Sequence, residues 1–147
     1  MTMNLQARTG AVLFILWGIL HVAGGAAILI AVSSGPEAGY AVYQQSTGTS
    51  PPLAGAILGD LAFSVAWIGA LVAAIGATLN WRNSPPGLAL NTALAGLTDL
   101  GLVIFLAVPG FVTWPEAAIG LALFAAAALF GGLACRTVSA TELRSAI

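Results

Sequence analysis

The most regular feature of the sequence is a succession of four long apolar stretches separated by shorter polar segments. They cover about residues 11–32, 53–79, 87–108 and 117–134. A bilayer core of about 30 Å requires roughly 20 apolar residues in a helix that rises about 1.5 Å per residue. Each stretch is close to this length, and each is apolar all round rather than on one face. The pattern therefore predicts four membrane-spanning helices.

Proline and capping residues mark the starts of these helices. Proline pairs or single prolines lie at or just before three of the starts, at positions 51–52, 85–86 and 115. Proline is tolerated there because the first N–H groups of a helix have no partner. Asn83 and Ser84 can cap the third helix, and Thr113 can cap the fourth. The short second and third links favour antiparallel neighbours, so we predict one all-α domain, residues 1–147, folded as an up-down bundle.

The arginines predict the orientation of this bundle. Arg8 precedes the first helix, Arg82 lies between the second and third, and Arg136 and Arg144 follow the fourth. With four crossings, all these positions fall on one side of the membrane. By the positive-inside rule both termini are cytoplasmic, and the link of residues 33–52 is extracytoplasmic.

The composition supports the membrane class and excludes several others. Charged residues make up 6% of the 147 residues, against about 25% in soluble domains. A net charge of −1 with four scattered arginines leaves no basic patch for nucleic acid. A single cysteine and a single histidine exclude a disulfide framework and a histidine-rich metal site. We therefore expect a multi-pass protein of the cell membrane, with a prokaryotic inner membrane as its setting and the lipid bilayer as its surroundings.

Three ionisable side chains fall inside the predicted spans: His21, Asp60 and Asp99. A charged group in the middle of a bilayer costs at least about 2.5–3.5 kcal/mol, so an ionisable residue there usually has a function. The helix rise puts His21 and Asp99 near the midplane and Asp60 in the outer third of its helix. We therefore predict that His21 and Asp99 meet at one level, and that all three residues are catalytic.

Neighbours at helical spacing extend this prediction to a polar seam that faces the inside of the bundle. Its members are Trp17 and His21 in the first helix, Asp60, Ser64 and Trp67 in the second, and Asn91, Thr98 and Asp99 in the third. Deep tryptophans such as Trp17 and Trp67 more often pack in the core, but these two could also wall an apolar pocket, whose ligand Ser64, Asn91 and Thr98 would contact. The structural alternative is that the small polar groups serve only as hydrogen-bond contacts between helices.

The longest link, residues 33–52, carries two tyrosines. Tyr40 and Tyr43 have the spacing of one helical face. They can form a short interfacial helix at the level of the lipid headgroups. They can equally fold over the mouth of the bundle as a lid that contacts a ligand.

These residues favour a site for a small, largely apolar ligand or substrate, in which a His–Asp pair acts as general acid and base. Haem with His21 as its one axial ligand is a variant of this hypothesis. No other metal or cofactor is indicated by the sequence.

Two other classes of function compete with this one. Proton-coupled transport would use Asp60, His21 and Asp99 as a relay, and four helices leave so little room that an oligomer would be needed. An accessory subunit of a larger membrane complex would contact its partner, or another copy of itself, through the Gly- and Ala-rich helix of residues 117–134.

Overall fold

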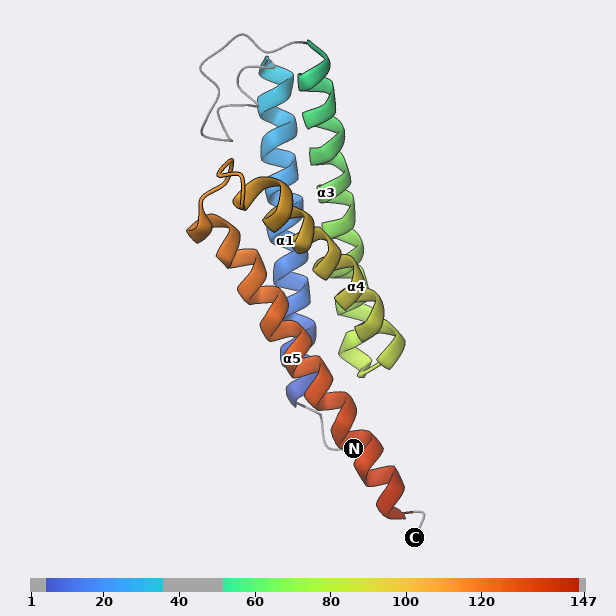
Figure 1. Cartoon of the computed structure of the whole chain (residues 1–147). Coiled ribbons are helices and arrows are strands. Elements are labelled where there is room, and N and C mark those ends of the chain that lie inside the picture. The colour runs from blue at the N-terminus through green and yellow to red at the C-terminus, as the bar shows by residue number, and fades with distance from the viewer. Residues whose placement is uncertain (1–4, 36–51, 146–147) are drawn as a thin grey trace.

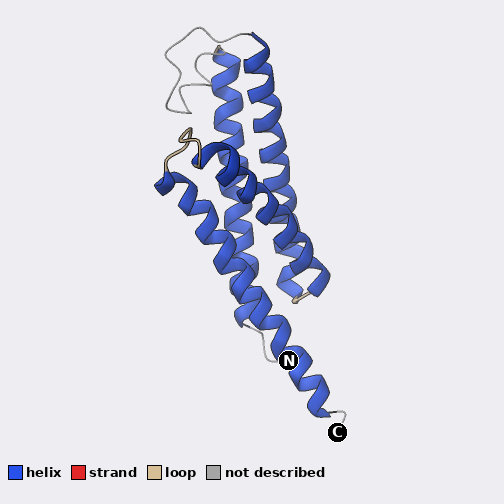
Figure 2. Cartoon of the chain, viewed as in Figure 1, coloured by secondary structure: helices blue, strands red, loops and turns tan. Residues whose placement is uncertain are grey.

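A computed structural model describes the backbone of residues 5–35 and 52–145, and the side chains of residues 5–35 and 55–136. Its elements, in chain order, are α1 (Leu5–Ser34), α3 (Pro52–Thr78), the 3-10 helix η1 (Asn80–Arg82), α4 (Pro85–Leu102), the π-helix η2 (Val103–Ala107) and α5 (Trp114–Ser145). Within these two ranges every regular element is helical (Figure 2), which confirms the all-α class.

Four segments of the described chain are long and apolar enough to cross a membrane, as the sequence predicts. They are Leu5–Ser34, Gly55–Arg82, Pro85–Ala107 and Trp114–Arg136. The first and last helices of the chain are longer than their apolar stretches, because α1 begins at Leu5 and α5 continues to Ser145. The sequence has no Gly or Pro between positions 135 and 145, so nothing in it stops α5 where the apolar stretch ends.

The helices pack in a defined order of neighbours. α1 contacts α3 and α5, and α4 contacts the same two helices, so α1 and α4 lie diagonally opposite each other (Figure 1). The beginning of α1 and the end of α5 lie at the same end of the molecule. The link between α4 and α5 lies below the upper ends of α1 and α3 in this view, so these two helices extend beyond the α4–α5 pair.

Glycines bring α1 close to both of its neighbours. A Cβ atom added to Gly25 would lie 2.5 Å from the carbonyl oxygen of Ala62 and 2.8 Å from the Cβ of Ala66, both in α3. One added to Gly10 would lie 2.9 Å from the backbone nitrogen of Gly131 in α5. Such distances leave no space for a side chain, which is the usual condition for close helix contact in a membrane.

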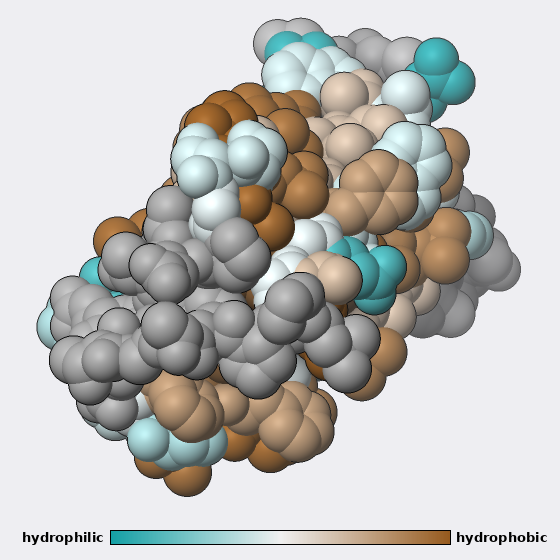
Figure 3. Space-filling view, turned by 90° about the horizontal axis from the view of Figure 1, so that it is seen from above, coloured by the Kyte–Doolittle hydropathy of each residue, from teal (hydrophilic) through white to brown (hydrophobic). Residues whose placement is uncertain are grey.

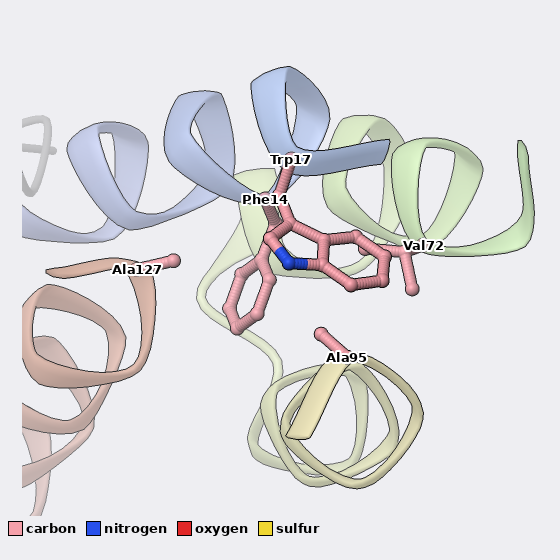
Figure 4. Close-up of a cluster of buried hydrophobic side chains, with 5 residues drawn as sticks. All are labelled: Phe14, Trp17, Val72, Ala95 and Ala127. Carbon is pink, nitrogen blue, oxygen red and sulfur yellow. The ribbon is translucent and has the colours of Figure 1, made fainter. Parts of the chain in front are cut away.

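Large side chains fill the space between α1 and α4. The buried core cluster consists of Phe14, Trp17, Val72, Ala95 and Ala127. In Figure 4 the side chains of Phe14 and Trp17 extend from α1 toward the region between α3, α4 and α5. Trp17 is completely buried. α1 therefore packs closely against α3 and α5 at its glycines, and its aromatic side chains fill the wider space between α1 and α4.

The outer surface of the described helices is largely apolar. Ile30, Leu97 and Phe105 are 68%, 69% and 70% exposed. Figure 3 views the end at which α1 finishes and α3 begins, and brown and tan residues cover much of the described surface there. Soluble monomers rarely expose apolar surface on this scale, so the surface fits a lipid environment.

Side-chain caps mark the starts of α4 and α5. Ser84 Oγ accepts a hydrogen bond from the backbone N–H of Gly87 (3.3 Å), which confirms Ser84 as the cap of α4. Asn83 instead ends η1 in the left-handed region, with φ of 56°. Before α5, Oε2 of Glu116 accepts from the backbone N–H and the hydroxyl of Thr113, at 3.0 and 2.7 Å. A glutamate reaching back in this way forms one half of a capping box.

We expect the Gly25→Ala variant to lose about 1–3 kcal/mol of unfolding free energy, because the added methyl group forces α1 away from α3. The adjacent Gly24→Ala variant is the matched control, since nothing lies within 4 Å of the Cβ position there. Equilibrium unfolding of the purified protein in mixed micelles measures both changes. Equal stability of the two variants would contradict the close contact between the helices.

Candidate functional site

The centre of the candidate site is the carboxylate of Asp99, which is 1% exposed. The indole N–H of Trp17 donates to both of its oxygens, at 3.3 Å to Oδ1 and 3.2 Å to Oδ2. The indole nitrogen can only donate, so the direction of this hydrogen bond is fixed. Because Trp17 belongs to α1 and Asp99 to α4, the bond joins the two diagonally opposite helices.

His21 lies one turn after Trp17 on α1 and faces the same carboxylate. Its ring stacks on the indole, with 3.6 Å between the ring centroids and 21° between the planes. Nδ1 lies 2.9 Å from the backbone carbonyl oxygen of Trp17. A carbonyl oxygen only accepts, so we assign the hydrogen of the neutral ring to Nδ1. Nε2 lies 3.8 Å from Oδ1 of Asp99, and His21 and Asp99 thus meet as their depths predict.

This arrangement sets two hydrogen-bond acceptors against each other. With the hydrogen of a neutral His21 on Nδ1, its Nε2 presents a lone pair to Asp99, and an ionised carboxylate has only acceptor oxygens. Two facing acceptors are stable together only when a hydrogen lies between them. The pair therefore favours one proton, on Nε2 or on the carboxyl group, or a donor group of another molecule. Such a pair is chemically able to give and take a proton.

Two further features surround Asp99 that the sequence pattern did not indicate. α4 passes into η2 shortly after Asp99, and the backbone N–H of Val103 donates to the carbonyl oxygens of Asp99 and Leu100. π-helical turns are rare and often lie at functional sites. On the α5 side, a Cβ atom added to Gly120 would lie 3.5 Å from Oδ1 of Asp99. No local sequence signal distinguishes Gly120 from the other 17 of the 18 glycines.

The structure corrects the inward seam expected on α3. Asp60, Ser64 and Trp67 are all exposed, Trp67 by 60%. The buried face of this helix is made of small and aliphatic residues, among them Leu58, Ala62, Gly69 and Val72. Small residues let α3 approach α1 closely, and this packing decides which face of α3 turns inward. The three polar and aromatic residues therefore do not join the site within one chain, and Trp67 does not wall a pocket with Trp17.

Asn91 and Thr98 make hydrogen bonds to backbone carbonyl groups, one between helices and one within α4. Nδ2 of the fully buried Asn91 donates to the carbonyl oxygen of Val72 in α3 (3.1 Å). The hydroxyl of Thr98 donates to the carbonyl oxygen of Leu94 in its own helix (2.8 Å). These contacts fit the structural alternative, and a ligand role for either residue stays a prediction. The predicted lid residues Tyr40 and Tyr43 lie outside the described residues.

The surroundings of His21 do not fit a haem. An axial histidine needs a ring nitrogen that is free to face the iron. Here Nδ1 contacts the carbonyl of Trp17, and Nε2 faces Asp99. The stacked indole also covers one side of the imidazole. Across the described part of the chain, no group of three or more His, Cys, Asp or Glu residues could hold a metal ion.

No family model, no curated protein and no solved structure matches this chain.

We expect Trp17→Phe to lower the free energy of unfolding by about 1–3 kcal/mol, because it leaves the buried Asp99 without its hydrogen-bond donor. Trp67→Phe changes an exposed tryptophan in the same way and is the matched control. Unfolding in mixed micelles measures both variants.

A double-mutant cycle separates this hydrogen bond from the lost indole volume. In an Asp99→Leu background the Trp17→Phe change should cost less, because the carboxylate that needs the donor is gone. An unchanged cost in that background would mean that Trp17 contributes only by its packing.

Proposed function

We propose that this chain is a membrane protein whose Trp17, His21 and Asp99 bind the polar end of a small, largely apolar ligand or substrate. The observation that carries the proposal is the buried carboxylate of Asp99 facing an imidazole nitrogen at 3.8 Å. Glycine contacts hold α1 to α3 and α5 without any ionisable side chain, so close packing of these helices does not explain why His21 and Asp99 are there. Ionisable groups that are costly in lipid and unnecessary for packing are best explained by a site.

Acid–base chemistry is the reaction class that we propose for such a substrate. His21 can exchange a proton through Nε2, while the Trp17 carbonyl holds Nδ1 and fixes the ring. A nearby carboxylate stabilises the imidazolium that forms when the ring takes up a proton. Isomerisation or hydration of a lipid-soluble substrate would suit this pair.

Proton-coupled transport by an oligomer is the second candidate, and the position of Asp60 favours it. Asp60 is exposed on α3 within a candidate span. A carboxylate facing lipid is costly unless another chain covers it or its side chain reaches the interface. A relay from Asp60 to the His21–Asp99 pair would therefore have to pass between copies of the chain.

The accessory-subunit hypothesis loses part of its support. The Gly- and Ala-rich helix that would form its contact, α5, carries the glycine pair Gly131 and Gly132. A Cβ atom on Gly131 would lie 2.6 Å from Leu88 of the same chain, so this position is already used within the fold. Gly132 has open space at its Cβ position and is free of that contact. A partner chain would therefore approach α5 on the side of Gly132.

We also propose the finer architecture: an antiparallel up-down bundle in a cell membrane, with a prokaryotic inner membrane as its setting and both termini in the cytoplasm. The order of helix neighbours supports the bundle. The guanidinium of Arg8 lies 5.1 Å from the ring centroid of Trp81, so the start of α1 and η1, which follows α3, share one level. Basic residues at this end favour its cytoplasmic side.

Reporter fusions test this orientation. A reporter that fluoresces only in the cytoplasm should be active when it is attached after Ile147. A phosphatase that works only outside the cytoplasm should be active when the chain is cut and fused within residues 36–51. The reverse result at both positions would contradict the orientation.

Native mass spectrometry of the gently extracted protein tests the ligand site. We expect the wild type to carry a defined extra mass that is lost in His21→Ala and in Asp99→Asn, because each variant removes one polar group that faces the ligand. Asp60→Asn removes an exposed carboxylate of the same kind and should keep the extra mass. A bare chain, equally folded in all four proteins, would contradict the site and favour a structural role for these groups.

A further inference from the structure

We infer that the ligand of this site carries a protonated amine on an apolar body, and that the amine lies beside Gly120 of α5. The inference rests on the proposed function, because it names the chemical class that the Trp17, His21 and Asp99 cluster would accept. Three features of the site support it: the polarity of the facing atoms, their charge, and the free space next to them.

The first feature is that the site presents acceptors to a ligand. Nε2 of His21 and Oδ1 of Asp99 face each other at 3.8 Å, which is too long for a direct hydrogen bond. With Nδ1 bound to the Trp17 carbonyl, the neutral His21 can only accept through Nε2. The carboxylate receives a hydrogen bond from the Trp17 indole and keeps acceptor capacity. A primary ammonium has three N–H donors, enough for both acceptors at once.

The second feature is that, in the part of the chain that the structure describes, no permanently charged cation lies near Asp99. Within the described residues, the only group within ion-pair distance of Asp99 is His21, and no Arg or Lys lies there. A ligand ammonium would supply the missing positive charge inside the bundle, where ion pairs are only weakly screened. A ligand carboxylate or phosphate would instead be repelled by Asp99.

The third feature is the space at Gly120. A Cβ atom placed there would lie 3.5 Å from Oδ1 of Asp99, 3.5 Å from Cε1 of His21 and 4.0 Å from Nε1 of Trp17. These are ordinary van der Waals distances, so the position has room for a methyl group that the glycine leaves open. His21 keeps 12% side-chain exposure against 1% for Asp99. A ligand would therefore pass His21 and reach the carboxylate in the space next to Gly120.

Gly120→Ala is the variant that tests this placement. The added methyl group fits without a clash and fills the space next to the acceptors. Gly132→Ala is the matched control, because it adds the same methyl group to α5 where nothing lies within 4 Å. Both variants replace glycine by alanine inside a helix, so any general effect on helix stability is shared.

The experiment places wild type, Gly120→Ala, Gly132→Ala and Asp99→Asn in lipid nanodiscs that contain dodecylamine, dodecanol or dodecanoic acid. Native mass spectrometry then measures the fraction of protein that carries each probe. We expect the wild type and Gly132→Ala to retain dodecylamine. Gly120→Ala and Asp99→Asn should each bind it more weakly by about tenfold or more, equivalent to at least about 1.4 kcal/mol. Circular dichroism and thermal unfolding establish that each variant is folded.

The outcomes separate this inference from the proposed function. Retention of dodecylamine by Gly120→Ala together with its loss in Asp99→Asn would overturn the place beside Gly120 and leave the site intact. Equal binding of dodecanol and dodecylamine would overturn the requirement for charge. Binding of dodecanoic acid alone, or of no probe at all, would overturn the ligand class. Dodecylamine binding that survives Asp99→Asn would overturn the proposed site itself.

Discussion

A carboxylate buried among membrane-spanning helices must find its hydrogen-bond donors inside the protein, because lipid offers none. Asp99 is in this position, and the indole of Trp17 meets the requirement from the opposite corner of the structure. The bond fixes the distance between α1 and α4, since an indole must fit between them. It also places His21, one turn further along α1, within 3.8 Å of the same carboxylate. The polar cluster is thus a consequence of how one buried charge is satisfied.

The rest of the packing follows from the two kinds of face on α1. Phe14 and Trp17 turn toward the centre and fill the wide space in front of α4. Gly18 and Gly25, spaced by two helical turns, face α3 and allow its backbone to come close. With glycines on one face and aromatic rings on another, α1 packs closely against α3 and contacts the more distant α4 through its large side chains. This arrangement brings Trp17, His21 and Asp99 together at the centre without opening the contacts that hold the helices together.

The number of helices could be predicted because the transfer of each apolar residue into lipid depends little on its neighbours. The common level of His21 and Asp99 followed from helix rise, which sets depth along the membrane normal. The rotation of each helix about its own axis, which decides the side chains that face inward, could not be predicted in this way. α3 carries a polar stripe with Asp60 and Ser64 and a stripe of small residues with Ala62 and Gly69. Which stripe turns inward depends on the shape of α1, and no pattern within α3 contains that information.

Asp60 and Asp99 show why an acidic residue within a span is not by itself evidence of a site. Asp60 is exposed and lies only five residues, about 7.5 Å of helix, from Gly55, where its candidate span begins. Asp99 is enclosed by its own chain. The first carboxylate lies near one end of its span, where the cost of a charge is lower, whereas the second requires a donor from another helix. It is therefore the enclosed carboxylate, with Trp17 and His21 arranged around it, on which the proposed site rests.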